Sequence, residues 1–356
     1  MARGMRTFFP MPELSSPKLS LLPPVAPATE GPTDGSLDAV SQRLASLLGS
    51  GGAGLLDPSG HELIFETSLE PRPLERAESP PVQAWAVDGG QCLVADARCL
   101  QVFATRSARV CWSGGRSVVE EAGALRVWLL GPGQSEGIRR QLGAPVTDEC
   151  VIDVNLLREW GEWSEASACV DEALPGALVL VDGDLAPDWR IAPDWLAGLL
   201  DRADDQAVTL IGVTKHTALS WGGAPLLGVL ERMADESLGP RSMWWVPVAR
   251  TEPAAGPGTQ IVVARLDPDA RFAFRIDLPG YVDPALALPV LAALCDDAGF
   301  PGYPYPLSTA DRLAACPNWV REELSHRIDD RLDRAGITPE VRERAFADRH
   351  RLMERY

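Results

Sequence analysis

The sequence predicts an α/β protein in which a mixed β-sheet is flanked by helices and extended by additional strands and helices. Two observations predict this class. Three β-rich segments follow one another between residues 84 and 131, and two short apolar runs, Leu178–Leu185 and Val208–His216, then alternate with helical segments. Apolar runs of this length are typical of strands that are buried on both faces of a sheet.

Length and charge limit the class of function. A chain of 356 residues with 46% hydrophobic side chains is long enough for one large α/β domain with elaborations, or for two domains. The formal net charge is -17, from 50 acidic and 33 basic residues. A protein that holds DNA unaided usually presents a basic face, because the neutralisation of phosphates supplies most of the non-specific affinity. The composition therefore predicts weak DNA binding by the isolated chain, and leaves room for a local basic channel or for a partner that delivers the strand.

Cysteine usage and hydropathy indicate the compartment. The seven cysteines form no Cys-x-x-Cys pair and no cluster with zinc spacing. An odd number of cysteines without an N-terminal secretory signal favours a reducing cytoplasm. No run of about 18 apolar residues occurs, so we expect no membrane span.

The chain divides into four predicted parts. These are a flexible N-terminal arm at 1–34, an N-terminal helix and linker at 35–83, a core domain at 84–315 and a C-terminal helical tail at 316–356. The arm is rich in Pro, Ser and Gly, a composition that favours irregular structure. In the second part we expect a helix near Leu37–Leu48, before the Gly-rich segment 49–52, and a linker that includes Glu70–Pro81.

A long amphipathic helix is expected before the first apolar run. Within Asp153–Leu174, the large side chains of Leu156, Trp160 and Trp163 recur at three- and four-residue spacing, and the Pro-Gly pair at 175–176 ends the pattern. Further elements are expected as helices near 193–203, 225–235 and 284–298 and as strands near 243–250, 259–266 and 272–278. The order of three strands, helix, strand, helix and strand is that of an RNase H-like core, and it differs from the regular alternation of a Rossmann domain.

Two aspartates stand where predicted strands end. Asp88 lies within Val87–Gly90, Asp182 ends the apolar run that begins at Leu178, and glycine follows each of them. Considered singly, Asp88 also fits a hairpin turn, and Asp182 fits a turn or a helix cap. If the two strands are neighbours, the carboxylates converge and favour the binding of a divalent cation. We therefore predict adjacent strands with carboxyl groups no more than about 8 Å apart.

Three acids of the long helix, Glu159, Glu162 and Glu165, precede the strand of Asp182. A Mg²⁺ or Mn²⁺ site needs a further oxygen ligand, and this helix is well placed to supply one. At least two of the three acids are expected to belong to a solvated helix face.

Lys215 ends the second apolar run, and Lys18 is the only other lysine in the chain. A compact ammonium is not interchangeable with a guanidinium, so a single lysine among many arginines indicates a specific position. We expect Lys215 to meet a scissile phosphate or to stabilise developing negative charge. Arg98, Arg106 and Arg109 are further candidate cations near the site.

The segment Gly302–Ala314, GYPYPLSTADRLA, combines two Tyr-Pro steps with a predicted helix. Proline restricts the residue before it, so the two steps predict a rigid turn. The helix that follows presents Asp311 and Arg312.

Four motifs in this order, AVDGG, VLVDGDL, GVTK and GYPYPLSTADRLA, resemble the NurA family of DNA-end-processing nucleases. The resemblance covers roughly residues 84–315. It implies an RNase H-like fold and a Mn²⁺- or Mg²⁺-dependent deoxyribonuclease, acting as a 5′–3′ exonuclease, an endonuclease or both, in DNA repair. It also implies a HerA-type hexameric ATPase as partner, and a homodimer is the natural way to present two sites to two strands.

By the same resemblance, Asp88 and Asp182 match the family's metal-binding aspartates, and Tyr303 matches a tyrosine near the metals. The family's acidic helix residue is expected at Glu165, on its spacing to Asp182, with Glu162 as the second choice. For an active enzyme we expect phosphodiester hydrolysis with two metal ions about 3.5–4 Å apart. In this hypothesis Asp88 bridges the ions, Asp182 and Glu165 hold one each, and Lys215 neutralises phosphate charge.

The chain also departs from the family pattern. The Asp-Gly motifs read DGG and DGD in place of DGS, and Asp311 stands where family members often carry a histidine. A carboxylate can replace imidazole on Mn²⁺ or Mg²⁺, but it adds negative charge and removes a proton donor. Two alternatives to an active nuclease therefore stay open: a catalytically inactive NurA-like subunit with a structural role in an ATPase complex, and an unrelated α/β protein.

Overall fold

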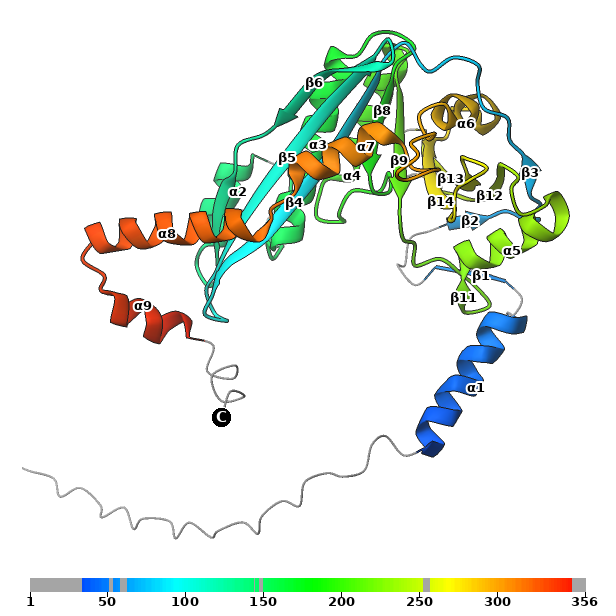
Figure 1. Cartoon of the computed structure of the whole chain (residues 1–356). Coiled ribbons are helices and arrows are strands. Elements are labelled where there is room, and N and C mark those ends of the chain that lie inside the picture. The colour runs from blue at the N-terminus through cyan, green and yellow to red at the C-terminus, as the bar shows by residue number, and fades with distance from the viewer. Residues whose placement is uncertain are drawn as a thin grey trace, which may run out of the picture. The chain divides into compact units, whose positions relative to one another are not determined.

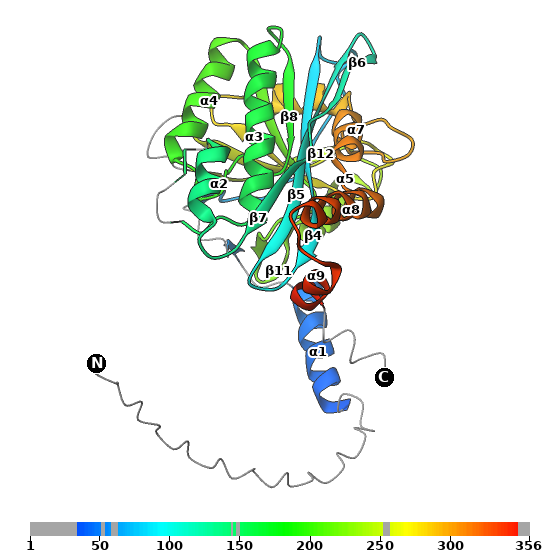
Figure 2. The ribbon, with the colours of Figure 1, turned by 90° about the vertical axis from the view of Figure 1, so that its left-hand side faces the viewer.

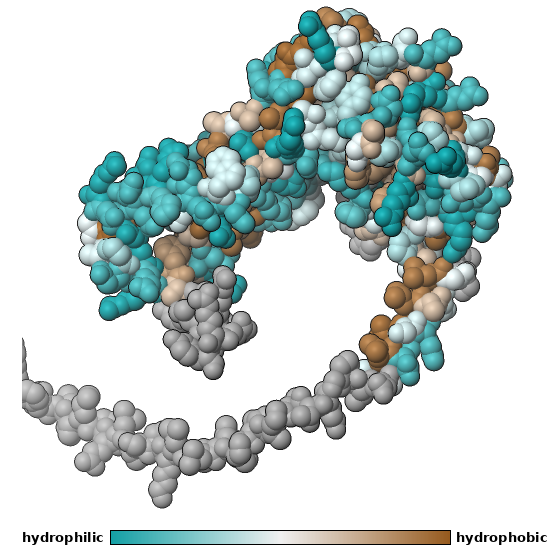
Figure 3. Space-filling model, viewed as in Figure 1, coloured by the Kyte–Doolittle hydropathy of each residue, from teal (hydrophilic) through white to brown (hydrophobic). Residues whose placement is uncertain are grey.

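The computed structural model describes residues 34–50, 54–57, 63–143, 145–146, 150–251 and 257–347, which fall into the two units Met1–Gly49 and Ser50–Tyr356. The first unit is described by α1 (Asp34–Ser50), which confirms the predicted helix near Leu37–Leu48. One side of α1 carries exposed apolar residues at three- and four-residue spacing (Figure 3), namely Leu37, Val40, Leu44 and Leu48. The predicted arm, apart from Asp34, lies outside the described residues.

A mixed sheet organises the second unit (Figure 1). Its strands, in chain order, are β2 (Leu63–Phe65), β3 (Arg72–Pro73), β4 (Ala84–Asp96), β5 (Gln101–Ser113), β6 (Arg116–Ala122), β7 (Arg126–Leu130), β8 (Leu178–Asp182), β9 (Thr209–Thr214), β12 (Trp244–Thr251), β13 (Thr259–Arg265) and β14 (Phe274–Pro279). Their order across the sheet is β2-β12-β13-β14-β9-β8-β4-β5-β6, with β3 also on β12 and β7 also on β5. A small separate sheet contains β1 (Leu55–Leu56), β10 (Ser220–Trp221) and β11 (Ala224–Pro225).

The centre of the sheet has the predicted strand order. β4, β5 and β6 form an antiparallel meander, and β8 pairs in parallel with β4 on one side and with β9 on the other. Parallel neighbours need a crossover connection, which helices supply before and after β8. The first four residues of β8, Leu178–Val181, are all buried, as expected for a strand that is covered on both faces.

Helices cover both faces of this sheet. Those described in the second unit are α2 (Ser135–Leu142), α3 (Val154–Glu172), α4 (Pro193–Asp205), α5 (Leu226–Leu238), α6 (Pro284–Ala292), α7 (Tyr305–Ala314), α8 (Asn318–Arg334) and α9 (Pro339–Phe346). Figure 2 shows α3 and α4 on one side of the central strands and α7 on the other. None of the helices in the described ranges combines the length and apolarity that a membrane span requires.

The alternation of side chains along β4 and β8 separates two cores. Ala86 and Leu180 pack in the core that includes residues of α7, whereas Val87 and Val181 pack in the core beneath α3. Successive side chains of a strand point to opposite faces. The residues that follow Val87 and Val181 therefore both point toward the α7 side.

Several elements differ from the sequence predictions, among them the small strands β1, β2, β10 and β11, which were not predicted. Helix α6 ends at Ala292 instead of continuing to 298, because Leu294 and Cys295 bond back to carbonyls three residues earlier and form tight turns. Helix α2 was not predicted, because it is short and buries only Ile138 and Leu142, which gives little periodic signal. The predicted linker segment contains β3, which pairs with β12 at the edge of the sheet.

The predicted helical tail is confirmed over its described part by α8 and α9. Val320 and Leu324 of α8 pack with Ala104 of β5 in a small apolar cluster. The face of α8 that Figure 3 shows is largely hydrophilic.

Candidate metal centre

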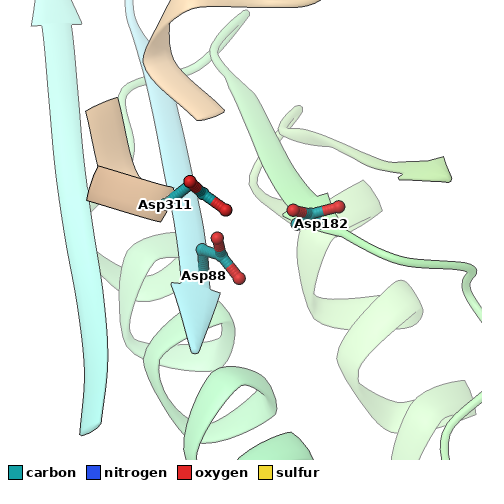
Figure 4. Close-up of side chains that lie close together, drawn as sticks. All are labelled: Asp88, Asp182 and Asp311. Carbon is teal, nitrogen blue, oxygen red and sulfur yellow. The ribbon is translucent and has the colours of Figure 1, made fainter. Parts of the chain in front are cut away.

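Strands β4 and β8 bring Asp88 and Asp182 together. In this parallel pair Val87 lies opposite Val181, and each valine is followed directly by the aspartate. Figure 4 shows both carboxyl groups near Asp311 of α7. Ligand oxygens of these three residues lie within 4.8 Å of one another. The prediction that Asp88 and Asp182 occupy adjacent strands with converging carboxylates is confirmed.

Helix α7 supplies the third carboxylate because it packs closely on β4. A side chain at Gly90 would place its Cβ 1.9 Å from the carbonyl oxygen of Ala314, at the end of α7. A β-carbon cannot approach a backbone oxygen to that distance, so glycine at position 90 is required for this packing. The close approach of α7 to the strand thus explains why position 90 is glycine in this chain, where the family's motif has serine.

Burial and neighbouring negative charge both act on the carboxyl group of Asp88. Its side chain is only 6% exposed. Burial, and next the negative charge of Asp182, raise the pKa of Asp88 to about 7, although a 2.6 Å hydrogen bond from the Gly89 amide opposes the shift. A divalent cation would stabilise the ionised form against both causes. The donor set of carboxylate oxygens fits Mg²⁺ or Mn²⁺.

Lys215 contacts this cluster directly from the end of β9. Its Nζ donates a 2.6 Å hydrogen bond to Oδ2 of Asp182 and lies 3.5 Å from Oδ1 of Asp311. Burial alone would lower the pKa of Lys215, but the hydrogen bond to Asp182 and the surrounding aspartates raise it. The side chain is therefore a fixed positive charge at the edge of the acidic cluster.

Tyr303 lies close to Lys215 and to the three aspartates. Its ring centroid is 5.0 Å from Nζ of Lys215, which is within the range of a cation–π contact. Its hydroxyl is buried and has no hydrogen-bond partner at ordinary geometry among the described residues. Burial, and then the charge of Asp182, raise the pKa of Tyr303, so the hydroxyl keeps its proton. The buried hydroxyl therefore lies beside the carboxylate of Asp182 with its proton in place.

The structure brings Glu162, and not Glu165, to the aspartates. Glu162 is 4% exposed and points at the backbone after Asp88: a β-carbon on Gly89 would lie 2.2 Å from its Oε1. Burial raises the pKa of Glu162 to about 8, although the positive charge of Arg158 opposes the shift. Arg158, one helical turn earlier, forms an ion pair with Glu162.

Glu165, preferred from its spacing to Asp182, lies on the same helix as Glu162 but forms its ion pair with Arg109. Its Oε2 is 3.9 Å from Nε of Arg109, which also donates 2.7 Å hydrogen bonds to Glu121 and Glu172. Arg109 pairs with Val87, so its side chain shares the α3 face with Val87. Spacing along the helix carries no information on how the helix is rotated against the sheet, so it cannot by itself choose between Glu162 and Glu165.

The other candidate cations do not join the cluster. Arg98 occupies the turn between β4 and β5, where its side chain is exposed, and Arg106 donates a hydrogen bond to the carbonyl of Ala315. Arg109 is neutralised by its glutamates. Among these four predicted cations of the described chain, Lys215 alone contacts the aspartates.

Sequence reasoning missed a buried ion pair next to the site. Arg275 donates two 2.8 Å hydrogen bonds to Asp277, and Oδ2 of Asp277 accepts a 3.1 Å hydrogen bond from the Leu185 amide. This pair lines a neighbouring cavity of 290 Å³ together with Asp184 and His216. The available signal was an Arg and an Asp two residues apart in a predicted strand, which places both on one face.

The fold was compared with known proteins. No protein-family model and no curated protein matches the chain. Three solved structures resemble it: the NurA nuclease from Sulfolobus solfataricus (15% identity, 85% of this chain and 97% of that chain covered, TM-score 0.55), a second NurA structure (10%, 79% and 93%, 0.46) and the catalytic domain of human endonuclease V (14%, 84% and 99%, 0.37). We assign the fold from the Sulfolobus solfataricus structure.

The described chain thus has an RNase H-like fold. Within that class it has the fold of a NurA nuclease, as the sequence motifs predicted. At 15% identity the likeness establishes the fold, and the site residues follow from the geometry given above.

Proposed function

We propose that this chain is a metal-dependent DNA nuclease of the NurA type. One observation carries the proposal: Asp88, Asp182 and Asp311, from three separate elements, present ligand oxygens within 4.8 Å of one another. The NurA-like fold supports a nucleic acid as the substrate, because the similar structure from Sulfolobus solfataricus is that of a nuclease.

In the proposed site, Asp88, Asp182 and Asp311 hold Mn²⁺ or Mg²⁺, and Glu162 approaches from α3. When bound, such an ion activates water and offsets negative charge during phosphodiester hydrolysis. Glu165 remains a weaker candidate ligand, since it forms an ion pair with Arg109.

The remaining residues would act on the DNA phosphate. Lys215 holds its ammonium at the edge of the carboxylates, where it can offset phosphate charge. The protonated hydroxyl of Tyr303 can donate a hydrogen bond to an oxygen that enters the site. Lys215 is held by its ion pair with Asp182 and Tyr303 by burial, so little reorganisation is needed when DNA enters.

We also propose that DNA is delivered by a HerA-type ATPase ring, and that the chain works as a homodimer in DNA-end resection. The net charge of -17 supports delivery by a partner. The neutralisation of Arg109 by glutamates adds to this support, because it removes one cation from any basic channel. The isolated chain should therefore bind duplex DNA weakly at physiological salt. Tight binding and processive digestion of long duplex without the ATPase would contradict this part of the proposal.

Digestion of linear DNA tests the nuclease proposal. We expect cleavage with Mn²⁺ or Mg²⁺, none with a chelator, and a loss of more than about 100-fold in Asp182→Asn, because a direct ligand should matter more than the outer-shell partners, which cost about 10–100-fold. Asp171→Asn is the matched control, since Asp171 is an exposed acid of α3 that pairs with Arg202. Cleavage by Asp182→Asn at the wild-type rate would refute the assignment.

An inactive NurA-like subunit is the second candidate function. Asp311, which replaces the family's usual histidine, favours it, because the site then lacks an imidazole proton donor. Failure of the wild-type chain to digest DNA with either metal, together with capture of a HerA-type ATPase in a pull-down, would support this role over the enzyme.

A further inference from the structure

Trp189 is an exposed aromatic side chain close in sequence to the metal centre. It lies in the segment 183–192 that connects β8 with α4, seven residues after Asp182. Its side chain is 77% exposed. Single exposed apolar side chains are common on protein surfaces, so the exposure of Trp189 gains meaning only together with its fixed backbone and its position in the chain.

The segment is fixed where it leaves the strand. Leu185 is buried, and its amide donates the 3.1 Å hydrogen bond to the buried carboxylate of Asp277. Arg275 holds that carboxylate through two 2.8 Å hydrogen bonds. The first turn after Asp182 thus has one defined path.

The segment is fixed again around Trp189 itself. The side chain of Arg190 is 8% exposed and donates hydrogen bonds to Asp188 (Nε, 2.7 Å) and to the carbonyl of Val151 (Nη1, 2.6 Å). It also pairs with Asp153 at 3.1 Å. The Arg190 guanidinium lies 5.9 Å from the Trp189 ring centroid. These contacts hold the backbone on both sides of Trp189 while its ring faces solvent.

The same segment is tied to the helix that approaches the aspartates. The amide of Asp188 donates a 2.5 Å hydrogen bond to Glu159 of α3. Glu159 precedes Glu162 by three residues, or about 4.5 Å along a helix axis. Glu162 lies against Gly89, so the backbone at Trp189 is tied both to the chain that follows Asp182 and to the helix that contacts the strand of Asp88.

We propose that Trp189 is a stacking platform for a nucleobase of single-stranded DNA, a few nucleotides from the scissile phosphate. The inference rests on the proposed nuclease function. Every base offers a π-face to an indole ring, so such a contact suits an enzyme that must accept any sequence. Bases within a duplex are already stacked on each other, so the platform selects an unpaired strand.

Trp319 is the natural control. It is another strongly exposed tryptophan, at 68%, but it lies on α8. The variants Trp189→Ala, Trp189→Phe and Trp319→Ala separate stacking at position 189 from a general effect of losing a surface tryptophan.

Binding is measured by fluorescence anisotropy with a labelled oligothymidine at low salt, in chelator, so that no cleavage occurs. We expect about tenfold weaker binding for Trp189→Ala, which is the effect of losing one stacked base, and near-wild-type binding for Trp189→Phe and Trp319→Ala. Cleavage is then measured with oligonucleotides that carry one abasic site at successive positions. The wild type should slow at one or two positions, and Trp189→Ala should lose that position dependence.

The outcomes distinguish the two proposals. Cleavage that is unaffected both by Trp189→Ala and by abasic sites overturns the platform and leaves the nuclease intact. Tryptophan-dependent DNA binding without any cleavage in Mn²⁺ overturns the nuclease and supports the platform. Absence of both binding and cleavage overturns both. If Trp189→Ala lowers only the capture of an ATPase, the residue belongs to a protein interface and the platform is wrong.

Discussion

Nζ of Lys215 lies 2.6 Å from Oδ2 of Asp182, so the lysine that directly follows β9 neutralises the aspartate that ends β8. The two strands are parallel neighbours, which places their C-terminal ends side by side. The ion pair stabilises a cluster of three carboxylates that would otherwise repel one another. It also means that the ammonium has to share Asp182 with any bound cation.

Replacement of Lys215 tests this sharing. We expect Lys215→Met to lower the cleavage rate by about 100-fold or more, because one preorganised positive charge near the phosphate is lost. Mn²⁺ affinity, measured by calorimetry, should stay equal or rise, since the competing cation is gone. Lys215→Arg should not restore the rate, because the guanidinium is larger and planar. A Lys215→Met variant with normal kcat would refute the assigned role.

Asp88 predicts a pH dependence of stability. Its pKa rises from an ordinary value of 3.8 to about 7 on folding, so the metal-free folded state binds a proton more tightly than the unfolded state. The resulting stabilisation is complete below about pH 4 and is lost as the pH rises to about 7; its size is on the order of 2–4 kcal/mol.

Thermal unfolding in chelator measures this effect. The difference in Tm between Asp88→Asn and the wild type should grow in favour of the variant from pH 4 to pH 7, and Mn²⁺ should reverse it for the wild type. A difference in Tm that does not change with pH would contradict the raised pKa of Asp88.

The two helix glutamates give a matched pair of variants. Glu162→Gln should lower Mn²⁺ affinity or cleavage by about 10–100-fold, because Glu162 lies against Gly89 beside Asp88. Glu165→Gln should stay within about twofold of the wild type, because its partner Arg109 keeps other carboxylates. A larger loss of Mn²⁺ affinity or cleavage in Glu165→Gln than in Glu162→Gln would instead support Glu165 as the ligand.

Gly90→Ser restores the family's usual motif and should be harmful in this chain. The added β-carbon would clash with the Ala314 carbonyl, so we expect a loss of about 1–3 kcal/mol in unfolding free energy and a displaced α7. Gly137→Ser is the control, because a β-carbon there meets no atom within 4 Å. Urea unfolding compares the two variants, and equal stability would show that α7 does not need glycine at position 90.

The sequence predicted the elements that have a strong local signal. The apolar run of β8, the periodicity of α3 and the Asp-Gly steps were sufficient to place Asp88 and Asp182 on neighbouring strands. Helix rotation was not predictable, so the choice between Glu162 and Glu165 required coordinates. The contacts that fix the segment around Trp189 were equally hidden, because Arg190 makes them with Val151 and Asp153, which are far away in the sequence.

The most direct test of the metal centre is anomalous X-ray diffraction from a crystal soaked in Mn²⁺. The account predicts a manganese peak among the carboxylates of Asp88, Asp182 and Asp311, with oxygen distances of about 2.0–2.6 Å. The same soak of Asp182→Asn should show a weaker peak or none. A manganese peak elsewhere on the chain, with none between these three aspartates, would contradict the account.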